Sequence, residues 1–207
     1  MHITKDANTS SAAGDRAVTD LRDAISHCQV CTAYLPNPPR PLAFFSRTAR
    51  IVITGQAPGR LAHESGIAWN DPSGRRLREW MEVDETTFYN QDRIAIVPMG
   101  FCFPGTGSSG DLPPRPECAP RWHGPIGENL PAGHLRLLVG NYAQAAYLPK
   151  AAGKNLVDRV RWSYDQDASQ IALPHPSWRV TGWMKRNPWF ESEVVPWLRR
   201  RIDTALK

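Results

Sequence analysis

The chain has 207 residues, 41% of them hydrophobic and 22% charged, which is enough for one ordinary folded domain and excludes a disordered chain. Its net charge of +5 and pI near 9.2 favour an acidic partner such as nucleic acid, although a mildly basic soluble enzyme fits the same numbers. No apolar run approaches the roughly 20 residues that span a bilayer, and the polar start MHITKDANTSSAAGD is unlike an export signal, so we expect a cytoplasmic protein with no membrane partner.

The N-terminal region divides into two parts. Residues 1–14 are expected to form a disordered tail, and residues 15–207 a single domain. A helix is predicted over 15–27, because Val18, Leu21 and Ile25 recur at helical spacing. This helix leads directly into a pair of cysteines.

Strand and helix patterns alternate through the rest of the chain. Short apolar runs bounded by turn residues predict buried strands at 50–54, 94–98, 135–140 and 171–174. Helical patterns lie at 73–81, 141–148 and 154–162, and after Pro188, where Pro196 is expected to kink or split the last helix. With right-handed crossovers, this order predicts an α/β fold whose central parallel sheet of about four strands carries helices on both faces.

The four cysteines form two pairs, Cys28 with Cys31 and Cys102 with Cys118. A disulfide is not expected in the reducing cytosol, whereas a C-x2-C pair places two thiolates within reach of one metal centre. Four thiolates are the ligand set of an iron–sulfur cluster or of a structural zinc ion. Spacing does not distinguish these metals, and four ordinary buried thiols are the alternative.

Two unusual loops directly follow predicted strands. GQAPG at 55–59 is a tight turn whose backbone amides can approach an anion or a carbonyl, although an ordinary strand-to-helix turn has the same composition. HPSWR at 175–179 places His175 where it can donate to a developing negative charge, while a lone histidine is more often structural. Ligands of parallel sheets bind outside the carboxyl ends of the strands, so both loops are expected at one site.

The segment 178–190 mixes aromatic and basic residues. It interleaves Trp178, Trp183 and Trp189 with cations, a mixture that suits base stacking and phosphate contact. A helix start with cations extended along its surface is the competing interpretation.

Together these features resemble the uracil-DNA glycosylase superfamily, and most closely its iron–sulfur branch, often called family four. The resemblance rests on the order of the C-x2-C pair, the GQAPG turn, the G-x-x-W-x-D-P-S-G segment at 66–74, the C-x15-C pair and the late HPS, and covers about residues 20–205. It implies a three-layer α/β/α sandwich and a monofunctional DNA N-glycosylase of base excision repair. Such a hydrolase flips a damaged base, here expected to be uracil, out of DNA and hydrolyses its N-glycosidic bond.

The resemblance also implies roles for individual residues. Trp69 would stack on the flipped base, and His175 would donate to its carbonyl as the bond breaks. The turn would face the nucleotide through Gly55, Gln56 and Ala57 and its phosphate through Pro58 and Gly59. The expected DNA contacts are Ser177, Trp178, Arg179, Lys185 and Arg186. The expected ligands of a 4Fe-4S cluster, or alternatively of zinc, are Cys28, Cys31, Cys102 and Cys118.

Several positions depart from the family pattern. Gln56 and Ala62 stand where acidic residues are usual, and the nearest substitutes for a water-orienting carboxylate are His63, Glu64 and Asp71. Pro98 replaces a base-reading asparagine and has no side-chain amide, so we assign base reading to Asn70 instead.

These departures leave other functions open. One is a catalytically weak or inactive nucleic-acid-binding protein of the same fold, and another is a glycosylase for a different deaminated base such as hypoxanthine. An α/β enzyme acting on another small ligand is a third. In each case we expect a monomer.

Overall fold

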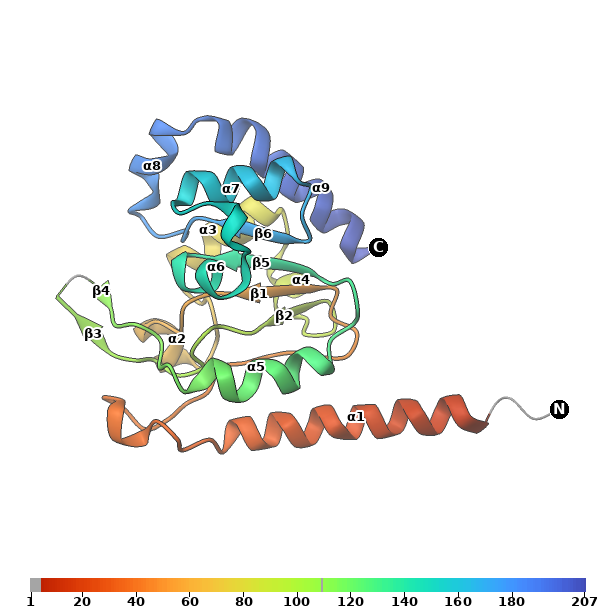
Figure 1. Cartoon of the computed structure of the whole chain (residues 1–207). Helices are drawn as coiled ribbons and strands as arrows, with labels where there is room; N and C mark the ends of the chain where they lie inside the picture. Colours follow the sequence, from red (N-terminus) through yellow and green to blue (C-terminus); the bar gives the residue numbers. More distant parts are fainter. Residues whose placement is uncertain (1–4, 109) are drawn as a thin grey trace.

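A four-stranded parallel sheet forms the centre of the molecule in the computed structural model, which describes residues 5–108 and 110–207 (Figure 1). Its order is β2-β1-β5-β6, and its strands are β1 (Ile51–Thr54), β2 (Ile94–Ile96), β5 (Leu135–Val139) and β6 (Gln170–Leu173). In register, Ile51 lies opposite Ile94 on one side and Leu135 on the other. All four predicted strands are present, and the α/β class with a parallel sheet is confirmed.

The strands were recognisable because both faces of the sheet are covered. Every residue of β1, β2 and β5 is buried, so these strands appear as nearly continuous apolar runs, interrupted only by Thr54 at the end of β1 and Arg136 in β5. On one face, Ile51 and Ile53 pack in a core with side chains of α3 (Pro72–Met81), α4 (Glu85–Tyr89), α7 (Leu156–Asp165) and α9 (Val195–Leu206).

The opposite face of the sheet is covered by α1 (Lys5–Ser26) and α5 (Cys118–Glu128), which lie side by side in Figure 1. Val52 packs there with Val18 of α1 and Ile126 of α5. Another helix, α6 (Asn141–Tyr147), directly follows β5. The result is three layers, with helices above and below the sheet.

The N-terminal helix is longer than predicted. It begins at Lys5 rather than Asp15, so residues 5–14 of the expected disordered tail are helical, and residues 1–4 lie outside the described residues. In the described part of α1, Val18 and Ile25 are buried against the sheet, which explains the helical spacing of its apolar residues.

The C-terminal helical segment is split beside Pro196, as expected. A π-helical turn, η3 (Phe190–Val194), passes into α9 at Val195, and Pro196 stands in the first turn of α9. Proline has no backbone N–H to donate and its ring crowds the preceding turn, so the regular α-helical ladder begins only here.

Sequence patterns did not predict several short elements. These are α2 (Arg60–Ser65), α4, α5, the single turns η1 (Thr32–Tyr34) and η2 (Lys150–Ala152), and a hairpin of β3 (Thr106–Gly107) and β4 (Gly110–Asp111). The helix α8 (Val180–Arg186) agrees with the competing interpretation of segment 178–190 as a helix start. The hairpin projects from the body beside α2 (Figure 1). Two-residue strands and one-turn helices are too short to show hydrophobic periodicity. The longer α5 contains Pro125, a residue that is unfavourable inside a helix. Within residues 5–108 and 110–207, no helix has the length and apolar character needed to cross a membrane.

Candidate active site

A pocket opens outside the carboxyl ends of β1, β2 and β6. Gly55 follows β1 directly, Pro98 follows β2, and His175 follows β6 after one proline. The pocket is also lined by the rest of the turn, Gln56, Ala57, Pro58 and Gly59, and by Ala62, Trp69, Asp71, Ser73, Gly110, Asp111, Ser177, Trp178 and Arg179. The fold thus brings the two predicted loops to one site.

The turn 55–59 is fixed by hydrogen bonds on two sides. The carbonyls of Gly55 and Gln56 accept from the backbone N–H groups of Met99 and Gly100, both at 2.9 Å. The side-chain amide of Gln56 donates to the carbonyl of Leu112 at 2.9 Å, so it is directed toward the segment after β4. The turn is therefore a rigid part of the pocket wall.

Trp69 packs against this turn and against His175. A Cβ atom at Gly55 would lie 2.9 Å from Trp69 Cζ2, so only glycine lets the indole approach this closely. The ring centroids of Trp69 and His175 are 5.8 Å apart and the ring planes differ by 33°. An aromatic ring and a hydrogen-bonding ring therefore lie next to each other in the pocket.

The backbone at Trp69 is held in an unusual conformation. Its φ of 58° is in the left-handed region, which costs a residue with a side chain roughly 1 to 3 kcal/mol. The following segment compensates, because Asp71 caps α3 by accepting from the N–H of Gly74 at 2.7 Å. A Cβ atom at Gly74 would lie 1.7 Å from the Trp69 carbonyl oxygen, so this close approach also requires glycine.

The surroundings of His175 favour the neutral form of its imidazole. Surrounding protein atoms desolvate the ring and lower its pKa from the ordinary value, although the residue remains accessible through the pocket. The carboxylates of Asp71 and Asp111 act in the opposite direction and raise this pKa. A neutral imidazole donates one N–H and can stabilise an oxygen that gains negative charge.

The loop after His175 presents an exposed aromatic residue at the mouth of the pocket. Trp178 is 76% exposed, and the Arg179 guanidinium lies 5.5 Å from the centre of its ring. The loop is attached to α3, because Arg76 donates to the carbonyl of Ser177 at 2.7 Å. Sequence patterns gave no indication of this role for Arg76, since its partner is distant along the chain.

Other predicted site residues do not line the pocket. Glu64 pairs with Arg60 at 2.8 Å on the exposed side of α2, and Asn70 is exposed outside the pocket. His63 is directed toward Phe103, with ring centroids 5.9 Å apart, and likewise does not line it. Lys185 and Arg186 lie exposed at the end of α8.

The mixed segment 178–190 is only partly a surface. Trp183 packs edge-on against Trp189 and Phe190, with centroids 5.7 and 5.4 Å apart, so these two tryptophans belong to the packing of the C-terminal region. Trp178 alone among the three tryptophans is exposed. The expected interleaved stacking surface is thus reduced to Trp178 and its neighbouring arginine.

Asp111 is a pocket residue that sequence reasoning missed. It lies in β4 of the short hairpin, far along the chain from the turn whose pocket it lines. The GDLPP segment around it has no helical or strand period, so the sequence carried no signal that would place this carboxylate beside His175.

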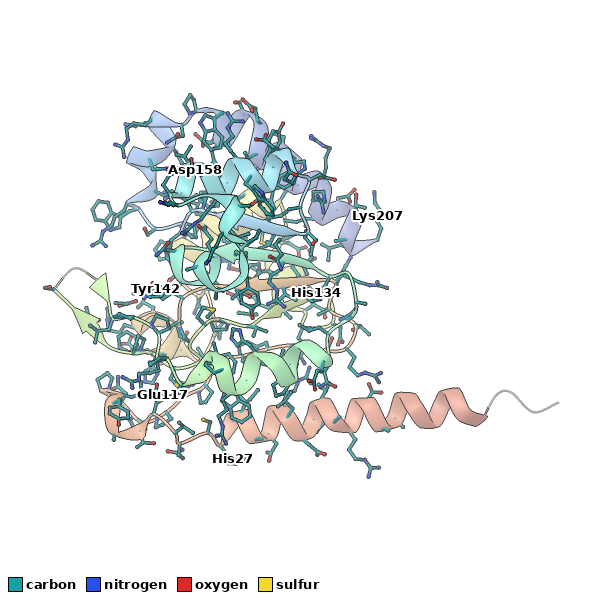
Figure 2. The ribbon with its side chains drawn as sticks, viewed as in Figure 1. His27, Glu117, His134, Tyr142, Asp158 and Lys207 are labelled. Atoms are coloured by element: carbon teal, nitrogen blue, oxygen red, sulfur yellow. The ribbon has the colours of Figure 1, made fainter. Side chains whose placement is uncertain are left out.

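The four cysteines line a second cavity between the end of α1, η1 and the start of α5. Its other walls include Pro39, Pro41, Phe101 and Trp122. Figure 2 labels Glu117 at the start of α5 and His27 just beyond the end of α1, the two elements that border this cavity. All four cysteines are free, and because they line one cavity, the fold brings the two sequence pairs together.

Burial disfavours the thiolate form of two of the four cysteines in this cavity. Burial raises the pKa of Cys102 to about 11 and that of Cys118 to about 12, so metal binding there must release protons. The N–H of Phe101 also donates to Cys118 Sγ at 3.4 Å. Within the part of the chain that the structure describes, no three His, Cys, Asp or Glu side chains converge closely enough to hold a single metal ion.

A known family model matches most of the chain. The family model described as Uracil DNA glycosylase superfamily matches residues 42–199. This range contains the sheet, the pocket and the second cysteine pair, and it begins after Cys28 and Cys31.

Proposed function

The chain belongs to the uracil DNA glycosylase superfamily, and on this premise we propose that it removes a damaged base from DNA by hydrolysing the N-glycosidic bond. The observation that carries the proposal is the contact of Trp69 with His175 on the turn 55–59, at the carboxyl ends of the strands. This arrangement offers one flat face for a flipped base and one N–H for its carbonyl.

In the proposed reaction, the flipped base stacks on the indole of Trp69. The bond between the base nitrogen and C1′ breaks, and its electron pair stays with the base. The neutral imidazole of His175 donates a hydrogen bond to the base carbonyl that gains negative charge. Water adds its oxygen to C1′ and releases one proton, which balances the departing anion.

The DNA strand is proposed to lie across the mouth of the pocket. Pro58, Gly59 and Ser177 line this region and would contact the phosphate of the flipped nucleotide. Trp178 is exposed there and can occupy the gap that the flipped base leaves in the stack. Unstacking a base costs a few kcal/mol, which an inserted indole offsets.

Uracil is the expected base, and hypoxanthine is the alternative that must be tested beside it. Pro98 lines the pocket without a side-chain amide, and its carbonyl accepts from His123 Nε2 at 2.9 Å. At this position the pocket therefore has no side-chain donor, and the Pro98 carbonyl already accepts a hydrogen bond. We expect the pocket to be less selective for uracil as a result.

We also propose that the four cysteines hold a 4Fe-4S cluster with a structural role. The four thiols around one cavity between α1 and α5 support it, since such a group would connect the N-terminal helix to the loop that precedes α5. Iron and acid-labile sulfide in anaerobically purified protein would identify the cluster. Stoichiometric zinc without sulfide would contradict it and identify a structural zinc site.

A glycosylase assay tests the proposed function. Anaerobically purified protein is incubated with labelled oligonucleotides carrying one uracil or one hypoxanthine, in single and double strands, and abasic sites are cleaved with alkali. We expect cleavage of the uracil strand, reduced about a hundredfold or more in His175→Ala without a matching loss of DNA affinity. Binding without cleavage of either base would instead favour a nucleic-acid-binding protein of the same fold.

A further inference from the structure

The pocket contains a carboxylate that the turn 55–59 itself lacks. We propose that Asp111 is the catalytic residue that orients the attacking water, and that Gln56 is the residue that positions it. This inference rests on the proposed glycosylase function, and it assigns two residues of the same pocket to specific steps.

Among the described residues, two carboxylates line the pocket, and they differ in their hydrogen bonds. Asp71 accepts a 2.7 Å hydrogen bond from the N–H of Gly74 and caps α3, so one of its oxygens is committed to the helix. Asp111 lies on an exposed hairpin, and among the described residues its Oδ1 accepts a long 3.4 Å bond from Thr106 Oγ1. Asp111 is thus the carboxylate more available to a water molecule.

The second oxygen of Asp111 lies directly above the turn. A Cβ atom at Gly59 would lie 3.1 Å from Asp111 Oδ2, so the absence of a side chain at Gly59 leaves room for the carboxylate. Asp111 also acts electrostatically on His175, although the two residues belong to different elements. The carboxylate and the imidazole line the same pocket, as the two sides of a bond-breaking site require.

Gln56 explains how a surface hairpin can hold a carboxylate at this place. Its amide N–H donates to the carbonyl of Leu112, the residue after Asp111, at 2.9 Å. The N–H of Leu112 donates in turn to the carbonyl of Gly105 at 2.8 Å. A glutamate at position 56 could not donate to a carbonyl, so the glutamine and the hairpin carboxylate form one arrangement.

The proposed step is balanced within the pocket. The water oxygen donates a lone pair to C1′ while the electron pair of the glycosidic bond leaves with the base. Asp111 accepts one proton of that water, and the proton is later released to solvent or to the departing base. Its negative charge also stabilises the positive charge that develops on the sugar.

The first test compares Asp111→Asn with Asp165→Asn, the same change on the exposed end of α7, outside the pocket. Single-turnover cleavage of uracil DNA is expected to fall at least a hundredfold in Asp111→Asn and to stay unchanged in Asp165→Asn. The Tm and the Kd for DNA should be unchanged in both variants. Full activity of Asp111→Asn beside an active wild type would overturn this inference and leave the glycosylase function intact.

The second test is rescue by a carboxylate in the turn. Gln56→Glu alone should lower activity about tenfold, because the bond to Leu112 is lost and two carboxylates repel each other. The double variant Gln56→Glu, Asp111→Asn should cleave at least tenfold faster than Asp111→Asn alone. If Asp111→Asn has a reduced cleavage rate and a lowered Tm, and the double variant does not recover the rate, Asp111 has a structural role. If the wild-type protein cleaves none of the oligonucleotides, the proposed glycosylase function itself is contradicted.

Discussion

The indole of Trp69 lies beside the imidazole of His175, with ring centroids 5.8 Å apart, and Gly55 is the residue that permits this contact. The two rings come from segments more than a hundred positions apart, one after β1 and one after β6. The parallel sheet brings them together because the carboxyl ends of its strands share one edge.

This contact predicts a graded response at Trp69. Stacking of a base on an aromatic ring is worth about 1 to 3 kcal/mol, so Trp69→Ala should weaken binding of a uracil-containing oligonucleotide roughly 5- to 150-fold. Trp69→Phe retains a ring and should lose much less. Equilibrium binding to single-stranded uracil DNA measures both, and equal affinities of wild type and Trp69→Ala would contradict a stacking role.

Gly55→Ala should mimic the loss of Trp69 without removing the ring. The new methyl group would start 2.9 Å from Trp69 Cζ2, so the indole must shift away from the turn. We expect cleavage to fall at least tenfold, because a shift of about 1 Å at a catalytic site can cost two orders of magnitude. Gly127→Ala is the matched control, since a Cβ atom there meets no atom within 4 Å. Similar rates for both alanine variants would show that the position of the indole is unimportant.

Trp178 is expected to act on duplex DNA rather than on the chemistry. Its side chain is 76% exposed, so Trp178→Ala should change the free energy of unfolding by less than about 0.5 kcal/mol. Cleavage of double-stranded uracil DNA should fall at least fivefold more than cleavage of the single strand, where no partner strand holds the base in the stack. An equal loss on both substrates would contradict a wedge at this position.

The sequence predicted the elements that have a clear hydrophobic pattern and missed the shortest ones. The strands were predictable because both faces of the sheet are buried, and the pocket followed from the two loops at their ends. Glu64, predicted for the site, does not line the pocket, because it pairs with Arg60 on the surface of α2. Asp111 was missed because its hairpin has strands of two residues, and tertiary contacts such as the bond from Gln56 to Leu112 fix its position.

The cysteine cavity predicts a stability effect before a chemical one. Cys102→Ser should lower metal content and Tm together, because the metal would join η1 and the end of α1 to the start of α5. Single-turnover cleavage by the remaining folded protein, measured below its Tm, should stay within a fewfold of wild type. A loss of cleavage at unchanged Tm would contradict a structural role for the metal.

Acid should destabilise the fold through a buried histidine. Burial lowers the pKa of His123 from its ordinary value of 6.5, and the charge of Arg136 lowers it further, while its bond to the Pro98 carbonyl raises it. The unfolded chain therefore takes up a proton at higher pH than the folded one. The stabilisation is complete above about pH 6.5 and is lost as pH falls toward the lower pKa of the folded state.

His123→Phe tests this origin of the acid sensitivity. The variant keeps a ring beside Phe101, whose centroid lies 5.9 Å from that of His123, but it cannot take up a proton. Its overall stability should be lower by about 1 to 3 kcal/mol, since Pro98 and Tyr147 lose their hydrogen-bond partner.

Between about pH 7.5 and 5.5, carboxylates with ordinary pKa values near 4 stay ionised, so denaturant unfolding in this range reports mainly on histidines. The decrease in unfolding free energy over this range should be smaller in His123→Phe than in wild type. His27→Asn, a change of an exposed histidine, should show the same decrease as wild type. An equal decrease in all three proteins would assign the acid sensitivity to other groups.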